Sequence, residues 1–261
     1  MEIFSTSFIS LLLVEEVINM TSVCMATYNG ERFIKEQIDS ILCQLSPDDE
    51  LVISDDGSTD RTLEIIASYN DKRIKLLHHK KNPKLAKVKH SRNFYYATEN
   101  FENALKEAKG DYIFLSDQDD VWLPNKVKVC IEKLKEADLV MHNLSEFSDD
   151  INKGFVLYKV NPIPKLWWKN LIKMNFWGCC MAFKKSVLDF AIPFPKNIIG
   201  HDYWISTIAL KFFKVLYIPL PLILHRSYEG SVSYKAKNSF LFKIYFRCKI
   251  FFEVLKKTRR N

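Results

Sequence analysis

From residue 21 to about residue 142, short runs of strand-forming residues alternate with segments in which apolar residues recur at helical spacing. This alternation is typical of a mostly parallel sheet that is flanked by helices. Beyond about residue 144 the alternation becomes irregular. We therefore predict an α/β fold with a less regular second half, followed by a terminal amphipathic helix.

The apolar periodicity places the individual elements along the chain. The predicted strands cover residues 21–27, 50–54, 74–78, 111–116, 138–142 and 215–218. Helices are predicted from about residue 31, after Asp60, before Gly110, after Pro124, over 201–213 and over 239–257. The second of these helices is expected to bury Leu63, Ile66 and Ala67, and Gly110 is expected to end the third helix.

The length and composition describe one globular unit of the size of an ordinary enzyme. A chain of 261 residues, 48% of them hydrophobic, can bury a substantial core, which excludes disordered and collagen-like proteins. The six cysteines include no Cys-x-x-Cys pair. Reduced cysteines in a cytoplasmic protein are therefore the simplest interpretation.

The first residues resemble neither a signal peptide nor a membrane span. The apolar run 8–14 is followed directly by Glu15 and Glu16, and it lacks a basic leader. No apolar run approaches the roughly 18 residues that a spanning helix needs. We expect residues 1–19 to be an extension that carries no chemistry.

Basic residues are concentrated in two segments. Residues 72–92 contain nine Lys or Arg and no Asp or Glu, and residues 235–261 contain nine against the single Glu253. A solvated surface is the ordinary explanation of one such run. Two runs favour an anionic partner, which at this point could be phosphates, a membrane face or a nucleic acid.

Two acidic groups follow predicted strands, where ligands collect in parallel α/β sheets. The first, from Asp55 to Asp60, contains Gly57 and can form a turn and a helix cap, which leaves one carboxylate of Asp55 or Asp56 to accept hydrogen bonds from a ligand. A plain turn explains part of this group but not both adjacent carboxylates.

The second acidic group, from Ser116 to Asp120, follows an apolar strand and holds three carboxylates within four residues. These charges repel one another unless a cation neutralises them. Mg2+ or Mn2+ suits such oxygen ligands and can share them with substrate phosphates. A third candidate acidic site is Asp202, which follows Gly200 and His201 at the start of an apolar helix. A simple helix cap is the ordinary interpretation of an Asp in this position.

Taken together, these segments resemble glycosyltransferase family 2. Residues 22–30 read Ser-Val-Cys-Met-Ala-Thr-Tyr-Asn-Gly, the acidic run 55–60 follows, and the segment 110–113 leads into 117–122. The similarity extends from residue 20 to about residue 230. The segments 116–122, 178–180 and 201–204 are most similar to bacterial rhamnosyltransferase-like members that build surface polysaccharide.

The resemblance implies a GT-A fold and a nucleotide-sugar donor such as a UDP- or dTDP-sugar. It implies a catalytic domain over 20–235, with a nucleotide-sugar-binding half at 20–143 and an acceptor half at 144–235, and a basic amphipathic tail at 236–261. The implied donor-binding residues are Thr27, Asp55, Asp56, Asn100 and Asp117. Arg92-Asn93 is the alternative to Asn100, but the spacing to Gly110 favours Asn100.

The same resemblance assigns the chemistry. Asp119 and Asp117 match the metal-binding Asp-x-Asp element, and Asp202 falls where the family keeps its base. One base suffices for a direct displacement, so inversion is expected, whereas a glycosidase needs two carboxyl groups at the bond. Lys and Arg of the 72–92 segment, or His225 and Arg226 after the last predicted strand, are further candidates to hold the phosphates. The processive Gln-x-x-Arg-Trp element is absent, which predicts addition of a single sugar.

The terminal helix places Phe240, Ile244, Phe251 and Leu255 on one face, with basic residues near the other. Such a helix either lies in a membrane interface or packs on the protein itself. We expect a cytoplasmic protein, peripheral on the inner face of the plasma membrane, with a glycan or lipid-linked acceptor. The alternatives are a nucleotidyltransferase, which usually needs a Gly-rich basic phosphate loop, and a nucleic-acid-binding protein, which the acidic loops disfavour.

Overall fold

The computed structural model describes residues 19–87, 92–148, 156–157, 163–173, 176–228 and 240–259. The predicted extension 1–19 therefore lies outside the described residues except for its last position, as do residues 88–91 of the first basic segment and 235–239 of the second.

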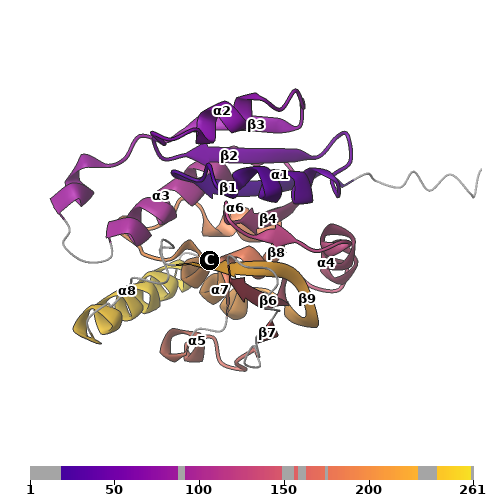
Figure 1. Cartoon of the computed structure of the whole chain (residues 1–261). Helices are drawn as coiled ribbons and strands as arrows, with labels where there is room; N and C mark the ends of the chain where they lie inside the picture. The colour runs from indigo at the N-terminus through magenta and orange to yellow at the C-terminus, as the bar shows by residue number, and fades with distance from the viewer. Residues whose placement is uncertain are drawn as a thin grey trace, which may run out of the picture.

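One mixed sheet runs through the described part of the chain, in the order β3-β2-β1-β4-β8-β6-β9-β5, with β7 paired to β6 (Figure 1). Its strands are β1 (Thr21–Thr27), β2 (Glu50–Asp55), β3 (Ile74–His78), β4 (Tyr112–Ser116), β5 (Val121–Trp122), β6 (Leu139–Ser148), β7 (Val156–Leu157), β8 (Met181–Lys184) and β9 (Val215–Ser227). Strands β3, β2, β1 and β4 are mutually parallel, and β6 is parallel to β9. This confirms the predicted α/β fold with a mostly parallel sheet.

The helices alternate with these strands as the periodicity predicted. They are α1 (Ile34–Leu42), α2 (Thr62–Ala67), α3 (Arg92–Lys106), α4 (Lys126–Leu134), α5 (Lys169–Ile172), α6 (Lys185–Ala191), α7 (His201–Phe212) and α8 (Phe240–Thr258), with short 3-10 turns η1 (Pro83–Lys87) and η3 (Gly178–Cys180). Helix α1 buries Ile34, Ile38 and Ile41, as expected. In α2 the inward residues are Thr62 and Ile66, so the prediction for Ala67 was wrong.

Gly110 plays a different part from the predicted helix end. Helix α3 already ends at Lys106. A Cβ at Gly110 would lie 2.5 Å from the backbone nitrogen of Ser22 and 2.7 Å from the carbonyl oxygen of Met20. Glycine is needed here because the start of β4 approaches the start of β1 closely.

The second half extends the same sheet with a change of direction. Strand β8 is antiparallel to both β4 and β6, so it joins the two parallel sections. Strand β9 continues to Ser227, well beyond the predicted end at Ile218, and its pairing with β6 shifts register between His142 and Ser145. Its far end also pairs with β5, directly after the acidic loop 117–120. This brings the end of β9 to the carboxyl end of β4.

Helix α8 lies at the lower edge of the molecule in the view of Figure 1, next to α5 and α7. Its buried residues are Phe246, Ile250 and Val254. Among the described residues, no helix is both long enough and apolar enough to cross a membrane.

Candidate functional site

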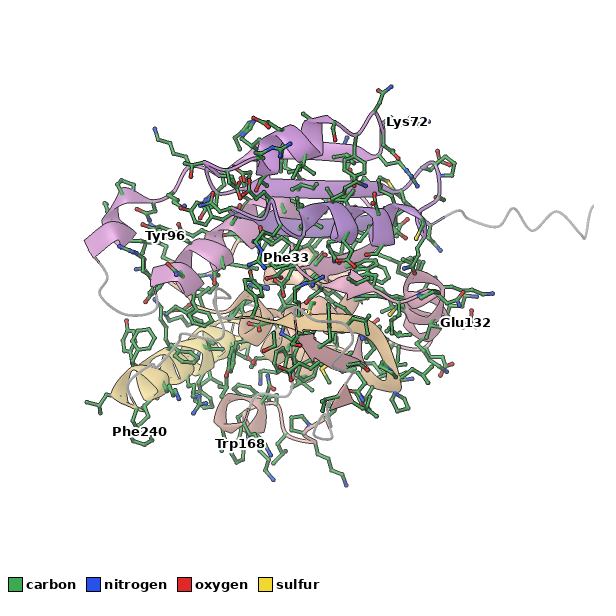
Figure 2. All side chains as sticks on the ribbon, viewed as in Figure 1. Phe33, Lys72, Tyr96, Glu132, Trp168 and Phe240 are labelled. Carbon is green, nitrogen blue, oxygen red and sulfur yellow. The ribbon has the colours of Figure 1, made fainter. Side chains whose placement is uncertain are left out.

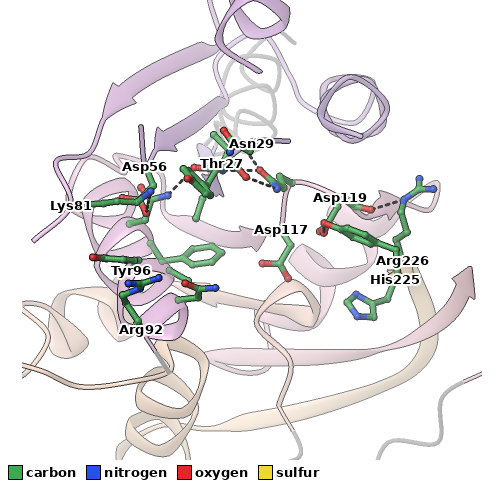
Figure 3. A pocket seen from close by; sticks show the side chains of 18 residues that line it. Thr27, Asn29, Asp56, Lys81, Arg92, Tyr96, Asp117, Asp119, His225 and Arg226 are labelled. Carbon is green, nitrogen blue, oxygen red and sulfur yellow. Dashed lines mark hydrogen bonds and ion pairs between the residues drawn. The ribbon is translucent and has the colours of Figure 1, made fainter. Parts of the chain in front are cut away.

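A cavity of about 640 Å³ opens at the carboxyl ends of β1, β2 and β4, between these strands, helix α3 and the end of β9 (Figure 3). The strand ends deliver polar side chains there because each strand runs into a loop at this edge of the sheet. Seven of the residues that the sequence marked for the site line this cavity: Thr27, Asp56, Asn100, Asp117, Asp119, His225 and Arg226. Two other marked residues, Asp55 and Asp202, are not part of this lining.

The carboxylate of Asp55 is used by the turn that follows β2. Its Oδ1 accepts hydrogen bonds from the backbone N–H of Gly57 at 3.0 Å and of Ser58 at 2.9 Å, and its Oδ2 accepts one from the Ser58 hydroxyl. Gly57 has φ +79°, which fits the expected tight turn. The turn thus occupies Asp55 and leaves Asp56 at the cavity.

Asp56 is 5% exposed and lies beside His79 and Lys81. The ring of His79 contacts its Oδ1 at 2.8 Å, and the Lys81 ammonium lies 3.5 Å from its Oδ2. The same ammonium lies 3.4 Å from the ring centroid of Tyr28, which lines the cavity and is 47% exposed. Two described residues of the basic segment 72–92, Lys81 and Arg92, thus line the cavity, and Lys81 is the one that contacts Asp56.

Asn100 joins helix α3 to the end of β1. Its Nδ2 donates to the carbonyl oxygen of Thr27 at 3.2 Å. Its Oδ1 is buried and has no hydrogen-bond partner in the described part of the chain. The alternative Asn93 lines the same cavity. Both candidates for the donor-side Asn thus reach the site.

Gln118 is a site residue that the sequence analysis missed. Its Oε1 accepts hydrogen bonds from the Thr27 hydroxyl at 2.6 Å and from the Tyr28 N–H at 2.8 Å, and its Nε2 donates to the Tyr28 carbonyl at 3.2 Å. A Cβ at Gly30 would lie 2.5 Å from Oε1 of Gln118. The glycine that ends the segment 22–30 was the available signal, because glycine permits this close approach.

Asp117 and Asp119 are half-buried and line the cavity (Figure 3). Burial raises the pKa of both carboxyl groups, and the negative charge of Asp120 raises them further. The hydroxyl of Tyr228 donates to Oδ2 of Asp119 at 2.8 Å and partly offsets this effect. Two oxygen donors whose charges are costly without a cation suit a hard divalent ion.

The third carboxylate of the loop, Asp120, is fully buried and held by β9. Its Oδ1 contacts the ring nitrogen Nδ1 of His225 at 2.9 Å and accepts a hydrogen bond from the Arg226 N–H at 3.1 Å. Burial opposes the charged form of His225, but the Asp120 carboxylate outweighs it and raises the pKa of the imidazole. Asp120, His225 and Cys179 offer ligand atoms within 4.8 Å of one another. Asp120 and His225 already pair with each other there.

Arg226 holds the acidic loop in place. Its Nε donates to the carbonyl oxygen of Asp119 at 3.0 Å, and its guanidinium reaches the Glu36 carboxylate at 2.6 Å. The guanidinium also lies 4.4 Å from the ring centroid of Phe33 and 4.5 Å from that of Phe147. Arg226 thus lines the cavity while Nε and one terminal nitrogen of its guanidinium bond to the protein.

A buried lysine beneath the loop was also missed. Lys126 donates to the carbonyl oxygen of Cys179 at 2.7 Å, and its ammonium lies 4.0 Å from the ring centroid of Trp122. Burial lowers the pKa of this ammonium, while Asp120 is among the groups that act in the opposite direction. Lys126 therefore ties the residues that follow the loop to the turn at Cys179.

Asp202 lies in the first turn of α7, outside the cavity lining. Its Oδ1 accepts a hydrogen bond from the Tyr203 N–H at 2.8 Å, and burial raises its pKa to about 6. Its charge also contributes to the raised pKa of Asp117, which places the two carboxylates within electrostatic reach. Gly178 permits the close packing that fixes this helix start, because a Cβ there would lie 2.8 Å from Nε2 of His201.

The chain is similar to known proteins in sequence and in fold. The sequence profile described as Glycosyl transferase family 2 matches residues 22–190. The chain is 31% identical over 237 residues to the dTDP-rhamnosyl transferase RfbG of Shigella flexneri, which covers 82% of this chain and 76% of that protein. It is 28% identical over 195 residues to the UDP-Glc:alpha-D-GlcNAc-diphosphoundecaprenol beta-1,3-glucosyltransferase WfgD of Escherichia coli, covering 74% and 70% of the two chains.

The fold also matches a solved structure. The crystal structure of S. aureus TarS 1–349 in complex with UDP-GlcNAc gives a TM-score of 0.63 at 19% identity. The match covers 85% of this chain and 62% of that chain, so the chain spans less than two thirds of that structure. At this identity the likeness concerns the fold.

Proposed function

Because the chain belongs to glycosyltransferase family 2 and is therefore a glycosyltransferase with the GT-A fold, we propose that it transfers a single sugar from a nucleoside-diphosphate donor to a hydroxyl group of a lipid-linked glycan. The transfer would use a divalent metal ion and would invert the configuration at the anomeric carbon. This reaction would serve the synthesis of a bacterial surface polysaccharide. The relatives described above carry dTDP and UDP in their names, which favours a dTDP- or UDP-sugar as the donor.

The observation that carries this proposal is that Asp56, Asp117 and Asp119 face one cavity of about 640 Å³. This volume lies within the range of roughly 300–1,000 Å³ that is usual for small-molecule sites. Carboxylates at one end suit the N–H and hydroxyl groups of a nucleoside, and paired carboxylates at the other suit a metal–diphosphate unit. A nucleotide sugar presents both kinds of group.

We assign the nucleoside to the region between Thr27, Asp56 and Asn100. The unpartnered Oδ1 of Asn100 and the partly exposed ring of Tyr28 support this assignment, because one accepts a hydrogen bond and the other can stack on a base. Asp55 contributes indirectly, because its carboxylate stabilises the turn that holds Asp56 at the cavity. The division at residue 143 remains our proposal: the first half binds the donor and residues 144–235 contribute the acceptor side.

Asp119, with Asp117, would hold Mg2+ or Mn2+. Their burial and mutual repulsion fit such an ion, because a cation removes the cost that raises both pKa values. When bound, the ion would supply Lewis-acid stabilisation of the departing diphosphate. Arg226 supports this pair as a positioning residue through its bond to the Asp119 carbonyl.

Asp202 is proposed as the general base. It takes the proton from the acceptor hydroxyl while the oxygen forms its bond to the anomeric carbon and the bond from that carbon to the diphosphate oxygen breaks. Attack from the face opposite the leaving group inverts the configuration. A pKa of about 6 keeps Asp202 ionised at neutral pH and makes it a stronger base than an ordinary carboxylate.

The proposal is tested by calorimetric binding of UDP and dTDP, with and without Mn2+, to the wild-type chain and to Asp119→Ala. We expect one nucleotide to bind in a manner that needs both the metal and Asp119. Asp202→Asn serves as the matched control, because it lies outside the cavity lining and should keep this binding. Metal-dependent binding that survives in Asp119→Ala, or its absence for every nucleotide, would contradict the proposed site.

A further inference from the structure

Helix α8 carries two apolar faces, of which the body of the protein covers only one. The inner face packs through Phe246, Ile250 and Val254, which recur every four residues and are buried. The opposite side exposes large apolar side chains: Phe240, Leu241, Ile244, Tyr245 and Phe252. The packing interpretation therefore holds for the inner face, and the exposed face has no covering element among the described residues.

The segment around α5 continues this exposed face. The ring of Trp167 stacks on that of Phe251 with centroids 5.2 Å apart, which joins the segment to α8. Beside this contact, Leu166, Trp168 and Ile172 are exposed. Figure 2 shows Trp168 and Phe240 at the same lower edge of the molecule, whereas Lys72 lies at the opposite edge. We call these eight exposed residues of the two segments the α5–α8 face.

Basic side chains surround the α5–α8 face. The described part of α8 and the residue after it hold six Lys or Arg against the single Glu253. Residues 163–173 add Lys165, Lys169 and Lys173, all exposed, and no acidic residue. Apolar and aromatic side chains bordered by lysine and arginine are the pattern of helices that lie in a membrane interface.

We propose that the α5–α8 face binds the surface of an anionic lipid bilayer, with α8 lying in the plane of the interface. The charge around the face selects this occupant. A second copy of the chain would bring two identical basic rims together in a symmetric dimer, and like charges disfavour that contact. Anionic headgroups complement the same rim, while the apolar side chains enter the acyl boundary.

The position of α8 connects this surface to the proposed reaction. The ring of Phe246 packs edge-on against that of Tyr203, with centroids 5.4 Å apart, and Tyr203 follows the proposed base Asp202 directly. This connection rests on the proposed function: a membrane-bound α8 would hold the base side of the site near the headgroups, where a lipid-linked acceptor presents its sugar. Bilayer binding itself depends on the α5–α8 face alone.

The test is flotation of the full chain with vesicles of phosphatidylcholine alone and with about 30% phosphatidylglycerol added. We expect binding to the anionic vesicles, weakened at high salt. Leu241→Asp and Phe252→Asp change side chains that are 78% and 60% exposed and should each lower vesicle affinity about tenfold. Leu220→Asp is the matched control, since Leu220 is a 51% exposed leucine of β9, and it should bind like the wild type.

A charge pair of variants tests the basic rim. Lys169→Glu should weaken binding to anionic vesicles, whereas Lys72→Glu, at the opposite edge of the molecule, should not. Asp202→Asn should bind vesicles normally while losing transfer, so failure of the catalytic proposal and failure of this one are distinguishable. Equal flotation of all variants, no flotation of the wild type, or a dimer that Leu241→Asp dissociates would overturn the proposal.

Discussion

The contact between Gly30 and Gln118 offers a quantitative test of how the cavity is built. In Gly30→Ala, the new Cβ would lie 2.5 Å from Oε1 and 2.8 Å from Cδ of Gln118. Gly30 does not have a positive φ, so alanine adds no backbone strain there. The Gln118 side chain must therefore move, and it gives up its hydrogen bonds to Thr27 and Tyr28.

The magnitude follows from those three hydrogen bonds. A typical hydrogen bond contributes about 1 kcal/mol net. Two of the three involve the backbone of Tyr28, which is exposed enough for water to replace part of the loss. We therefore expect Gly30→Ala to lower the free energy of unfolding by about 1–2 kcal/mol. Gln118→Ala removes the same bonds and should lower it by a similar amount.

The decisive measurement is a double-mutant cycle by urea unfolding of the full chain. Once Gln118 is alanine, the clash is gone, so adding Gly30→Ala should cost close to nothing. The two changes should then show a coupling of about 1–2 kcal/mol relative to additivity. Calorimetry of UDP or dTDP binding in Mn2+ should give the same pattern, because Gln118 ties the loop 117–120 to the end of β1.

Gly57→Ala provides the control for this cycle. Gly57 has φ +79°, and no atom lies within 4 Å of the position that a Cβ would take there, so alanine strains the backbone without touching Gln118. Its effect should add to that of Gln118→Ala. Additive costs for Gly30→Ala and Gln118→Ala would refute the reasoning, because they would mean that the two positions do not compete for space.

Three further predictions concern charge. Asp202→Asn should abolish transfer while nucleotide binding persists. The wild-type rate should fall as pH drops through about 6, because the base must be deprotonated and its pKa is raised to about 6. A pH–rate profile flat down to pH ~5 would contradict this role. Metal affinity measured by calorimetry should weaken as pH falls from about 8 through about 6, because the pKa of Asp117 is raised to about 8 and that of Asp119 to about 6, and each carboxyl group binds a cation only when ionised; pH-independent affinity would remove them as ligands. Lys126→Met should cost about 1–3 kcal/mol in urea unfolding, since it leaves the Cys179 carbonyl without its donor, and an unchanged midpoint would show that this bond contributes little.

The sequence predicted most of the first half of the fold because each element there carries its own local pattern. Strand β1 and strand β3 have the predicted bounds. The predicted strand 215–218 is shorter than β9, which continues through Pro219 and Pro221 although proline disfavours the interior of a strand. Register shifts in the pairing with β6 accommodate this stretch, and no local pattern reveals a partner strand more than 70 residues away.

Local sequence patterns likewise predicted some residues of the candidate site and missed others. Charge clustering after a buried strand marked the acidic group from Ser116 to Asp120, because that signal lies within a few residues, and the family resemblance selected Asp117 and Asp119 within it. It did not distinguish Asp55 from Asp56, since the distinction depends on which carboxylate the turn at Gly57 accepts. Gln118 resembles any polar loop residue, and its contacts are with residues 90 and 91 positions earlier. Such pairings appear only once the strands are arranged.

The pairing of Asp120 with β9 also has a consequence for protein synthesis. The groups that hold its carboxylate, His225 and the Arg226 N–H, are made 105 and 106 residues later. While the ribosome extends the chain, the parallel strands β1 to β4 can assemble, but their acidic loop lacks these partners. The acidic loop therefore gains these partners only after β9 has left the exit tunnel, so a nascent chain that stops before β9 carries the first four parallel strands with an unpaired Asp120.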